Sequence, residues 1–224
     1  MMQRFPMPPF RTQRNNMKKT VKIIALTAVL ILAAVMAASC GADYTKEELC
    51  KSAGALIEAS YKINEVYFGE GLPISEEDSE DAKKFAEENG LTLENVQFLP
   101  VTEESPYTSI DEIKKDTEKV YSKEYCEYLY SMAFEGFSTE DGTAAVYAKY
   151  IEDEGGVLTA RIDLVENALP LDRKYDLSSI KAKKMKKDMA TVTVDSYIDG
   201  KKDETLTFTL VKEEDGWRLD TPTY

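Results

Sequence analysis

Residues 191–220, TVTVDSYIDGKKDETLTFTLVKEEDGWRLD, decide the fold of the C-terminal half of the chain. Valine alternates with threonine over 191–194, and leucine or phenylalanine alternates with threonine over 205–210. An apolar–polar alternation with a period of two gives a strand one buried face and one solvent-exposed face, which is typical of antiparallel sheets. The Asp-Gly pairs at 199–200 and 215–216 are hairpin turn signals. The stretch therefore predicts an antiparallel sheet of hairpin-connected strands.

The same alternation begins earlier, from Ala144 onward. Over residues 158–165 Leu158, Ala160, Ile162 and Leu164 alternate with other side chains, after a glycine pair at 155–156. This pattern predicts one more strand of the same antiparallel series. A short strand is expected at 96–99, where Pro100 ends it.

The N-terminal half has helical periodicity instead. Thr45 and Glu48 form a capping box, and Gly69, Gly71 and Pro73 end the helix that follows. We expect its inward face to consist of residues spaced three and four apart: Leu49, Ala53, Leu56, Ser60, Ile63 and Tyr67.

Three further helices are expected between this one and the strands. A surface helix lies within 75–90, with Ala82, Phe85 and Ala86 facing inward. Ser109-Ile110-Asp111-Glu112 offers a second capping box, with Ile113, Thr117 and Val120 on the apolar side, and Ser122 caps a helix that ends at Gly136. Helices first and strands afterwards predict an α+β fold, in which the N-terminal helices pack on one face of a curved antiparallel β-sheet.

This order of elements, closed by the strand Asp215-Gly216-Trp217-Arg218-Leu219-Asp220, resembles the NTF2-like and cystatin-like folds. The resemblance covers roughly residues 45–224 and is architectural. It implies a single extracytoplasmic domain over 45–224, with a pocket between helices and sheet. Many exported lipoproteins of Gram-positive bacteria carry such a domain.

The stretch 17–40, MKKTVKIIALTAVLILAAVMAASC, predicts where that domain works. A basic lead, a short apolar run and small residues before Cys40 are typical of an export signal. The stretch resembles the lipobox of bacterial lipoproteins, although Ala37 stands where that family usually has leucine. The resemblance implies a signal peptide at 17–39, a lipid on Cys40 and a lipidated tether at 40–44.

These predictions place the domain at the cell membrane, lipid-anchored on the extracytoplasmic face. The alternative is an uncleaved membrane anchor, since the run nearly reaches the ~18 apolar residues of a spanning helix. Residues 1–16 hold three prolines and no acidic residue, and we treat them as a disordered leader or an over-extended start.

The charge excludes one class of partner. The chain has a net charge of −13, although residues 1–39 contain only basic ionisable side chains. Such an acidic domain repels phosphate backbones, so no nucleic acid is expected. The lysines at 181, 183, 184, 186 and 187 stand out against this background. They indicate either an anionic partner or an edge strand protected from pairing with other sheets.

The sequence offers few candidate catalytic groups, because the chain has no histidine. This removes the Ser-His-Asp and Cys-His arrangements and the common zinc sites. Ser178 and Lys181 match an S-x-x-K spacing without its companion motifs, and the acidic cluster at 76–81 lacks the spacing of a calcium loop. We therefore expect no enzyme, no cofactor and no metal, and free, shielded thiols at Cys50 and Cys126.

Aromatic residues supply the ligand-binding candidates, Tyr121, Tyr125, Tyr128 and Trp217. The tyrosines lie too densely to face one way on a helix, so some are exposed or line a cleft. Trp217 is expected in the core beside Phe208, and the competing interpretation is an exposed binding residue. The sequence favours a non-catalytic binding domain for a protein or small ligand. The alternatives are an inhibitor of a cell-wall hydrolase and an enzyme that uses the carboxylates at 152–154.

Overall fold

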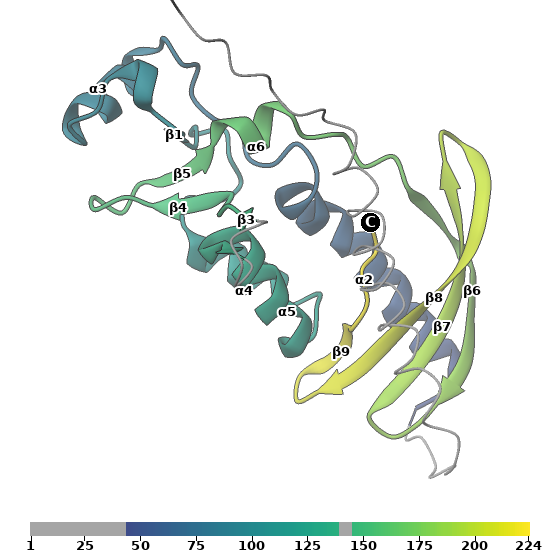
Figure 1. Ribbon diagram of the computed structural model, residues 1–224. Helices are drawn as coiled ribbons and strands as arrows, with labels where there is room; N and C mark the ends of the chain where they lie inside the picture. Colours follow the sequence, from purple (N-terminus) through teal and green to yellow (C-terminus); the bar gives the residue numbers. More distant parts are fainter. Residues whose placement is uncertain (1–43, 139–144) are drawn as a thin grey trace, which may run out of the picture. The chain divides into compact units, whose positions relative to one another are not determined.

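Helix α2 (Lys46–Tyr67) is the long helix that packs along the C-terminal sheet, as the computed structural model in Figure 1 shows. The structure describes residues 44–138 and 145–224, and the contacts group Gly41–Tyr224 into one compact unit. The expected leader, signal peptide and Cys40 lie outside the described residues, as does the expected tether except for Tyr44. No helix among the described residues is long and apolar enough to cross a membrane.

The predicted capping box at the start of α2 is confirmed. The Thr45 hydroxyl accepts a hydrogen bond from the Glu48 amide, and the Glu48 carboxylate accepts from the Thr45 amide at 2.7 Å. The inward face is as expected with one exception: Ile57 is fully buried, whereas Leu56 is half-buried at the margin of the core.

The next three helices also begin at serine caps. They are α3 (Glu80–Glu88) after Ser79, α4 (Ile110–Thr117) after Ser109, and α5 (Lys123–Tyr130) after Ser122. The prediction of a second capping box at Ser109 and Glu112 is wrong in one detail. The Glu112 carboxylate accepts from the amide and hydroxyl of Thr108, one residue before the expected partner. After α5, a wider turn over Ser131–Glu135 ends at Gly136 (φ 68°), where the sequence predicted the end.

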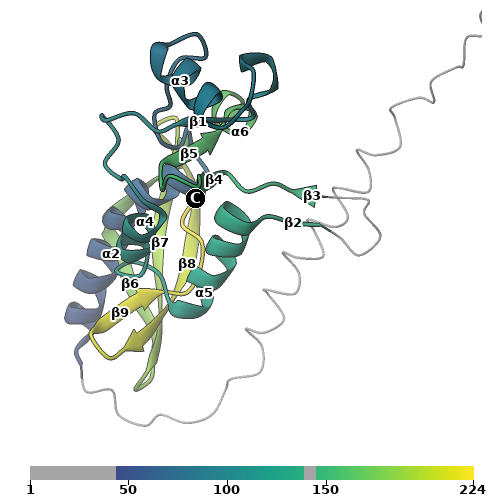
Figure 2. The same ribbon diagram turned by 90° about the vertical axis from the view of Figure 1, so that its left-hand side faces the viewer.

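The C-terminal strands form a four-stranded antiparallel sheet in the order β6-β7-β8-β9. Its members are β6 (Lys174–Met185), β7 (Met189–Ile198), β8 (Lys201–Glu213) and β9 (Gly216–Leu219). The valines at 192 and 194 and the residues at 208 and 210 are buried as predicted. Asp199 (φ 51°) and Gly200 (φ 72°) form the left-handed turn that joins β7 to β8. Helix α2 lies along this sheet (Figures 1 and 2).

The predicted α+β class is confirmed, but the described strands form three sheets and not one. A separate three-stranded antiparallel sheet has the order β1-β5-β4, from β1 (Phe98–Pro100), β4 (Tyr150–Glu152) and β5 (Leu158–Arg161). A two-stranded ribbon pairs β2 (Phe137–Ser138) with β3 (Ala145–Val146). The antiparallel prediction holds, but the strands before residue 170 do not join the main sheet.

The predicted strand at 158–164 is also wrong in its second half, which forms the short helix α6 (Ile162–Glu166). Strand β5 pairs with β1 and β4 only as far as Arg161. Just beyond it, the Ile162 amide still donates to the Gln97 carbonyl at 3.0 Å, next to the start of β1. The backbone groups that follow have no strand partner among the described residues. A helical turn satisfies those groups within the segment itself, so helix replaces strand.

Candidate functional site

A pocket of about 250 Å³ lies between α2, the segment leading into β6, the end of β7 and the C-terminal tail. Helix α2 contributes Tyr61, Asn64 and Glu65, which share one side because they are three and four residues apart. The other walls are formed by Pro170, Leu171, Asp172, Arg173, Ile198, Thr223 and Tyr224. The accessible lining is mostly apolar, so the pocket suits an apolar group better than a charged one.

Beside the pocket, four buried polar side chains bind one another. The Asn64 amide nitrogen donates to the Thr223 hydroxyl at 2.8 Å, and the Tyr121 hydroxyl donates to the Asn64 amide oxygen at 2.6 Å. Thr223 also donates to the Ser60 hydroxyl at 2.7 Å. All four are at most 2% exposed. Since burial disfavours the phenolate, the pKa of Tyr121 is raised to about 12 and the phenol stays protonated.

Aromatic and ionic contacts hold the rim in place. Tyr61 stacks on Tyr175 with ring centroids 6.2 Å apart, and its hydroxyl accepts from the Tyr175 amide. Tyr224 stacks on Phe68 at 3.6 Å. The Arg173 guanidinium binds Asp203 at 2.8 Å, so its charge is matched outside the pocket. The rim is therefore ordered by contacts that do not need a ligand.

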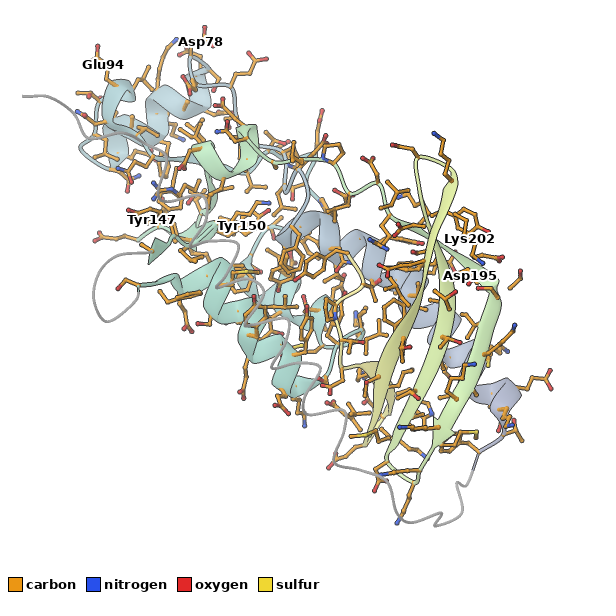
Figure 3. All side chains as sticks on the ribbon, turned by 45° about the vertical axis from the view of Figure 1, so that its right-hand side comes forward. Asp78, Glu94, Tyr147, Tyr150, Asp195 and Lys202 are labelled. Carbon is orange, nitrogen blue, oxygen red and sulfur yellow. The ribbon has the colours of Figure 1, made fainter. Side chains whose placement is uncertain are left out.

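The C-terminal end of α2 is closed by Lys149 and Tyr150, at the point where strand β4 begins. The Lys149 ammonium donates to the Gly69 carbonyl at 2.9 Å, in a helix with no basic residue in its own last turn. The Tyr150 hydroxyl donates to Val66 and accepts from the Leu72 amide. Tyr150 is fully buried, whereas Tyr147 is 57% exposed (Figure 3). Burial lowers the pKa of Lys149 to about 8, although Glu65 acts in the opposite direction.

Three of the four predicted aromatic candidates lie in one row. Tyr121 and Tyr125 have ring centroids 4.9 Å apart, and Tyr125 and Tyr128 are 6.0 Å apart. Tyr121 is buried in the polar network, Tyr125 is half-buried, and Tyr128 is 52% exposed. Their exposure therefore runs from core to solvent, and none of the three contributes to the wall of the apolar pocket.

Trp217 lies apart from that row. It shares the core-facing side of β9 with Leu219, but it is half-buried and does not lie beside Phe208 as expected. Its ring stands edge-on to Tyr44 at 4.8 Å, and its cross-strand partner is Lys212. The ring nearest to Phe208 is instead Tyr175, at 5.3 Å. The expected neighbour is wrong because Trp217 sits near the end of the sheet, opposite the last residues of β8.

A second, more polar pocket of about 530 Å³ lies between α5 and the β8–β9 turn. Its lining includes Cys126 and five carboxylates, at Glu118, Glu127, Glu213, Glu214 and Asp215. The Cys126 thiol is buried and its pKa is raised to about 11, mainly by that burial. A thiol in this state is a poor nucleophile at neutral pH. Cys50 and Cys126 are both free, within helices, as the sequence predicted.

The remaining candidates have structural partners. Glu152 accepts from the Ile110 amide at the start of α4, and Asp153 accepts from the Val157 amide in a turn. Ser178 lies within β6 and binds Asp176 at 2.6 Å, while Lys181 faces Thr193 on β7. Over the described ranges, no group of three or more metal-ligating side chains is positioned to hold a metal ion.

Sequence reasoning missed most of the pocket: Tyr61, Asn64, Arg173, Thr223 and Tyr224. One signal was present, since Ser60 and Asn64 are polar residues on the apolar side of a predicted helix. The tail residues gave no comparable signal, because their burial depends on contacts with α2 across the whole chain. No protein-family model matches this chain, and neither does any curated protein sequence.

Proposed function

We propose that the chain is a lipid-anchored binding domain on the extracytoplasmic face of the cell membrane, with no catalytic role. In this proposal Cys40 carries the lipid and residues 45–224 form an NTF2-like or cystatin-like domain. The long helix α2 on an antiparallel sheet supports that fold assignment. The export signal and Cys40 in the sequence support the location.

The observation that carries the binding role is the apolar pocket beside α2. Its polar neighbours, Asn64, Thr223 and Tyr121, already bind one another, so they are not available as a reactive group. A volume of about 250 Å³ is at the small end for ligand sites. The occupant is therefore a small, largely apolar molecule, or one apolar side chain of a peptide.

Mass spectrometry of the gently purified protein under native conditions tests this role. The wild type is expected to carry a bound apolar molecule, or to bind the dye 1-anilinonaphthalene-8-sulfonate once that molecule is removed. A Leu171→Trp variant fills the pocket and should lose both forms of binding. Leu169→Trp is the matched control, because Leu169 is 77% exposed and does not line the pocket. Absence of both ligand and dye from the wild type would exclude the pocket as a binding site.

A further inference from the structure

The start of α2 and the hairpin between β6 and β7 lie together at one end of the main sheet (Figure 1). The Tyr44 hydroxyl donates to the Lys186 carbonyl at 2.6 Å, and the Tyr44 ring stands edge-on to Trp217. The Lys212 ammonium lies 5.7 Å from the centre of the Tyr44 ring. We refer to this surface as the tether end, and it comprises Tyr44, Lys184, Lys186, Lys187, Lys212 and Trp217.

The tether end is basic in an acidic chain. Five lysines fall within residues 181–187, while the chain as a whole has a net charge of −13. Among the described residues, none of the five forms an ion pair. The acidic groups nearby are Asp188 in the hairpin, Glu47 and Glu48 in the first turn of α2, and the carboxylates at 213–215, of which Asp215 pairs with Arg218. The basic character is concentrated in the hairpin segment itself, where residues 181–188 contain five lysines and a single carboxylate, Asp188.

Protection of a sheet edge explains only part of this cluster. Strand β6 is an edge of the main sheet, so the lysines up to Lys184 fit that role. Lys186 and Lys187 follow the strand, in the turn before β7, where there is little edge left to protect. These two lysines call for another explanation.

The short covalent distance between Cys40 and Tyr44 suggests an explanation for Lys186 and Lys187. Four residue steps separate Cys40 from Tyr44, and an extended chain spans at most about 14 Å over that length. A lipid on Cys40 therefore holds the tether end close to the headgroups, and this step rests on the proposed lipidation. Charges act strongly over about 8–10 Å at physiological salt, and each lysine near an anionic bilayer contributes roughly a five-fold gain in binding.

We propose that the tether end docks on an anionic lipid headgroup surface. Its lysines lie over the headgroups, and Tyr44 and Trp217 lie at the interface, where such amphipathic rings are common. The acidic region around α3, marked by Asp78 and Glu94 in Figure 3, then faces away from the membrane. Docking fixes the orientation of the domain, so that the pocket beside α2 has a constant position relative to the bilayer.

Energy transfer from Trp217 tests the proposal, because it is the chain's sole tryptophan. The mature protein is reconstituted into phosphatidylcholine vesicles containing a dansyl-headgroup acceptor, with and without phosphatidylglycerol. Transfer should rise in the anionic vesicles and fall again at high salt. Lys184→Glu with Lys187→Glu should lower the docked population ten-fold or more, roughly as the per-lysine gain implies.

The matched control is Lys83→Glu with Lys84→Glu, on α3 at the far end of the domain (Figures 1 and 2). It makes the same change in net charge and should leave transfer unchanged. Equal transfer in both vesicle types, an equal loss in both variants, or competition by soluble polyglycerol phosphate without any vesicle preference would overturn the proposal. The mass of the same sample reports the lipid separately, so a missing lipid and a missing docking surface give different results.

Discussion

The two ends of helix α2 are held in different ways. At the N-terminal end, an exposed capping box and the half-buried rings of Tyr44 and Trp217 make the contacts. At the C-terminal end, buried polar side chains arrive from distant parts of the chain, including Tyr121, Lys149 and Thr223. The N-terminal end is exposed to solvent beside the lysines of the β6–β7 hairpin, and the C-terminal end is buried and closed by hydrogen bonds.

This difference indicates that the C-terminal end of α2 contributes more to the stability of the fold than the N-terminal end does. A buried polar group that loses its partner costs about 1–3 kcal/mol, whereas a hydrogen bond facing water is replaced by one to the solvent. Substitutions at the C-terminal end of α2 should therefore lower the free energy of unfolding. Substitutions at the N-terminal end should be tolerated, which leaves that surface open to a role outside the fold.

The largest effect is expected at Asn64. Asn64→Leu removes both the donor to Thr223 and the acceptor for Tyr121, and should lower the free energy of unfolding by about 3 kcal/mol. In a domain of this size, that corresponds to a fall in Tm of about 6–12 °C. Asn95→Leu is the control, because the exposed Asn95 binds only Thr92 nearby. Equal Tm values for the two variants would refute the stabilising role of the buried network.

The next effect is expected at Trp217, on the other end. A fully buried aromatic ring replaced by alanine costs about 3–5 kcal/mol, and the half-buried Trp217 should cost about 2 kcal/mol. Urea unfolding of Trp217→Ala, followed by circular dichroism, measures this. Tyr128→Ala serves for comparison and should have little effect, because Tyr128 is 52% exposed. A loss as large as that of Asn64→Leu would show that the tether end is part of the core after all.

Lys149 gives the C-terminal end a pH dependence. Burial lowers its pKa from 10.5 to about 8, so between these values the unfolded chain binds more protons than the folded one. Lys149 therefore contributes a rise of about 1 kcal/mol in the free energy of unfolding between pH 8 and pH 9. The Cys126 thiol, whose pKa is raised from 9.0 to about 11, opposes this contribution from about pH 8 upward, as do the buried tyrosines whose pKa values are raised.

Thermal unfolding at several pH values measures the rise. Lys149→Met should abolish it, whereas the same substitution at the exposed Lys115 should retain it. A difference in stability between the wild type and Lys149→Met that stays constant from pH 8 to 9 would contradict the assignment of a depressed pKa to Lys149.

The smallest effect is expected at the capping box. Thr45→Ala removes the side-chain acceptor for the Glu48 amide and should cost about 1 kcal/mol or less. Thr92→Ala is the reference, since the exposed Thr92 hydroxyl accepts from the Asn95 side chain but caps no backbone amide of the short helix after it. Calorimetry of the two variants measures their losses in free energy of unfolding. A loss for Thr45→Ala larger than that for Asn64→Leu would contradict the proposed difference between the two ends of α2.

Local signals predicted most of the fold. The caps at Thr45, Ser109 and Ser122 placed three helices, because the hydroxyl and the amide it satisfies lie within a few residues. Alternation placed β7 and β8 and their buried faces. These features depend on neighbours in sequence, so one chain is enough to find them.

Contacts between residues far apart in the chain could not be predicted from the sequence. The residues at 162–164 alternate as a strand would, yet they form α6 because pairing along β5 stops at Arg161. The position of Trp217 depends on the β8–β9 register, which sets it opposite Lys212. The pocket depends on Thr223 reaching Asn64 across most of the chain. In each case the partner is chosen by packing, and no short pattern encodes it.

The mass of the mature protein, isolated from membranes of a host that processes bacterial lipoproteins, tests the lipid-anchored assignment most directly. We expect a chain that begins at Cys40, carries a diacylglycerol on its sulfur and partitions into detergent. A Cys40→Ala variant should lose the lipid and accumulate as the precursor. Recovery of an intact, unlipidated chain of residues 17–224 from wild-type membranes would contradict the lipid anchor and show an uncleaved one.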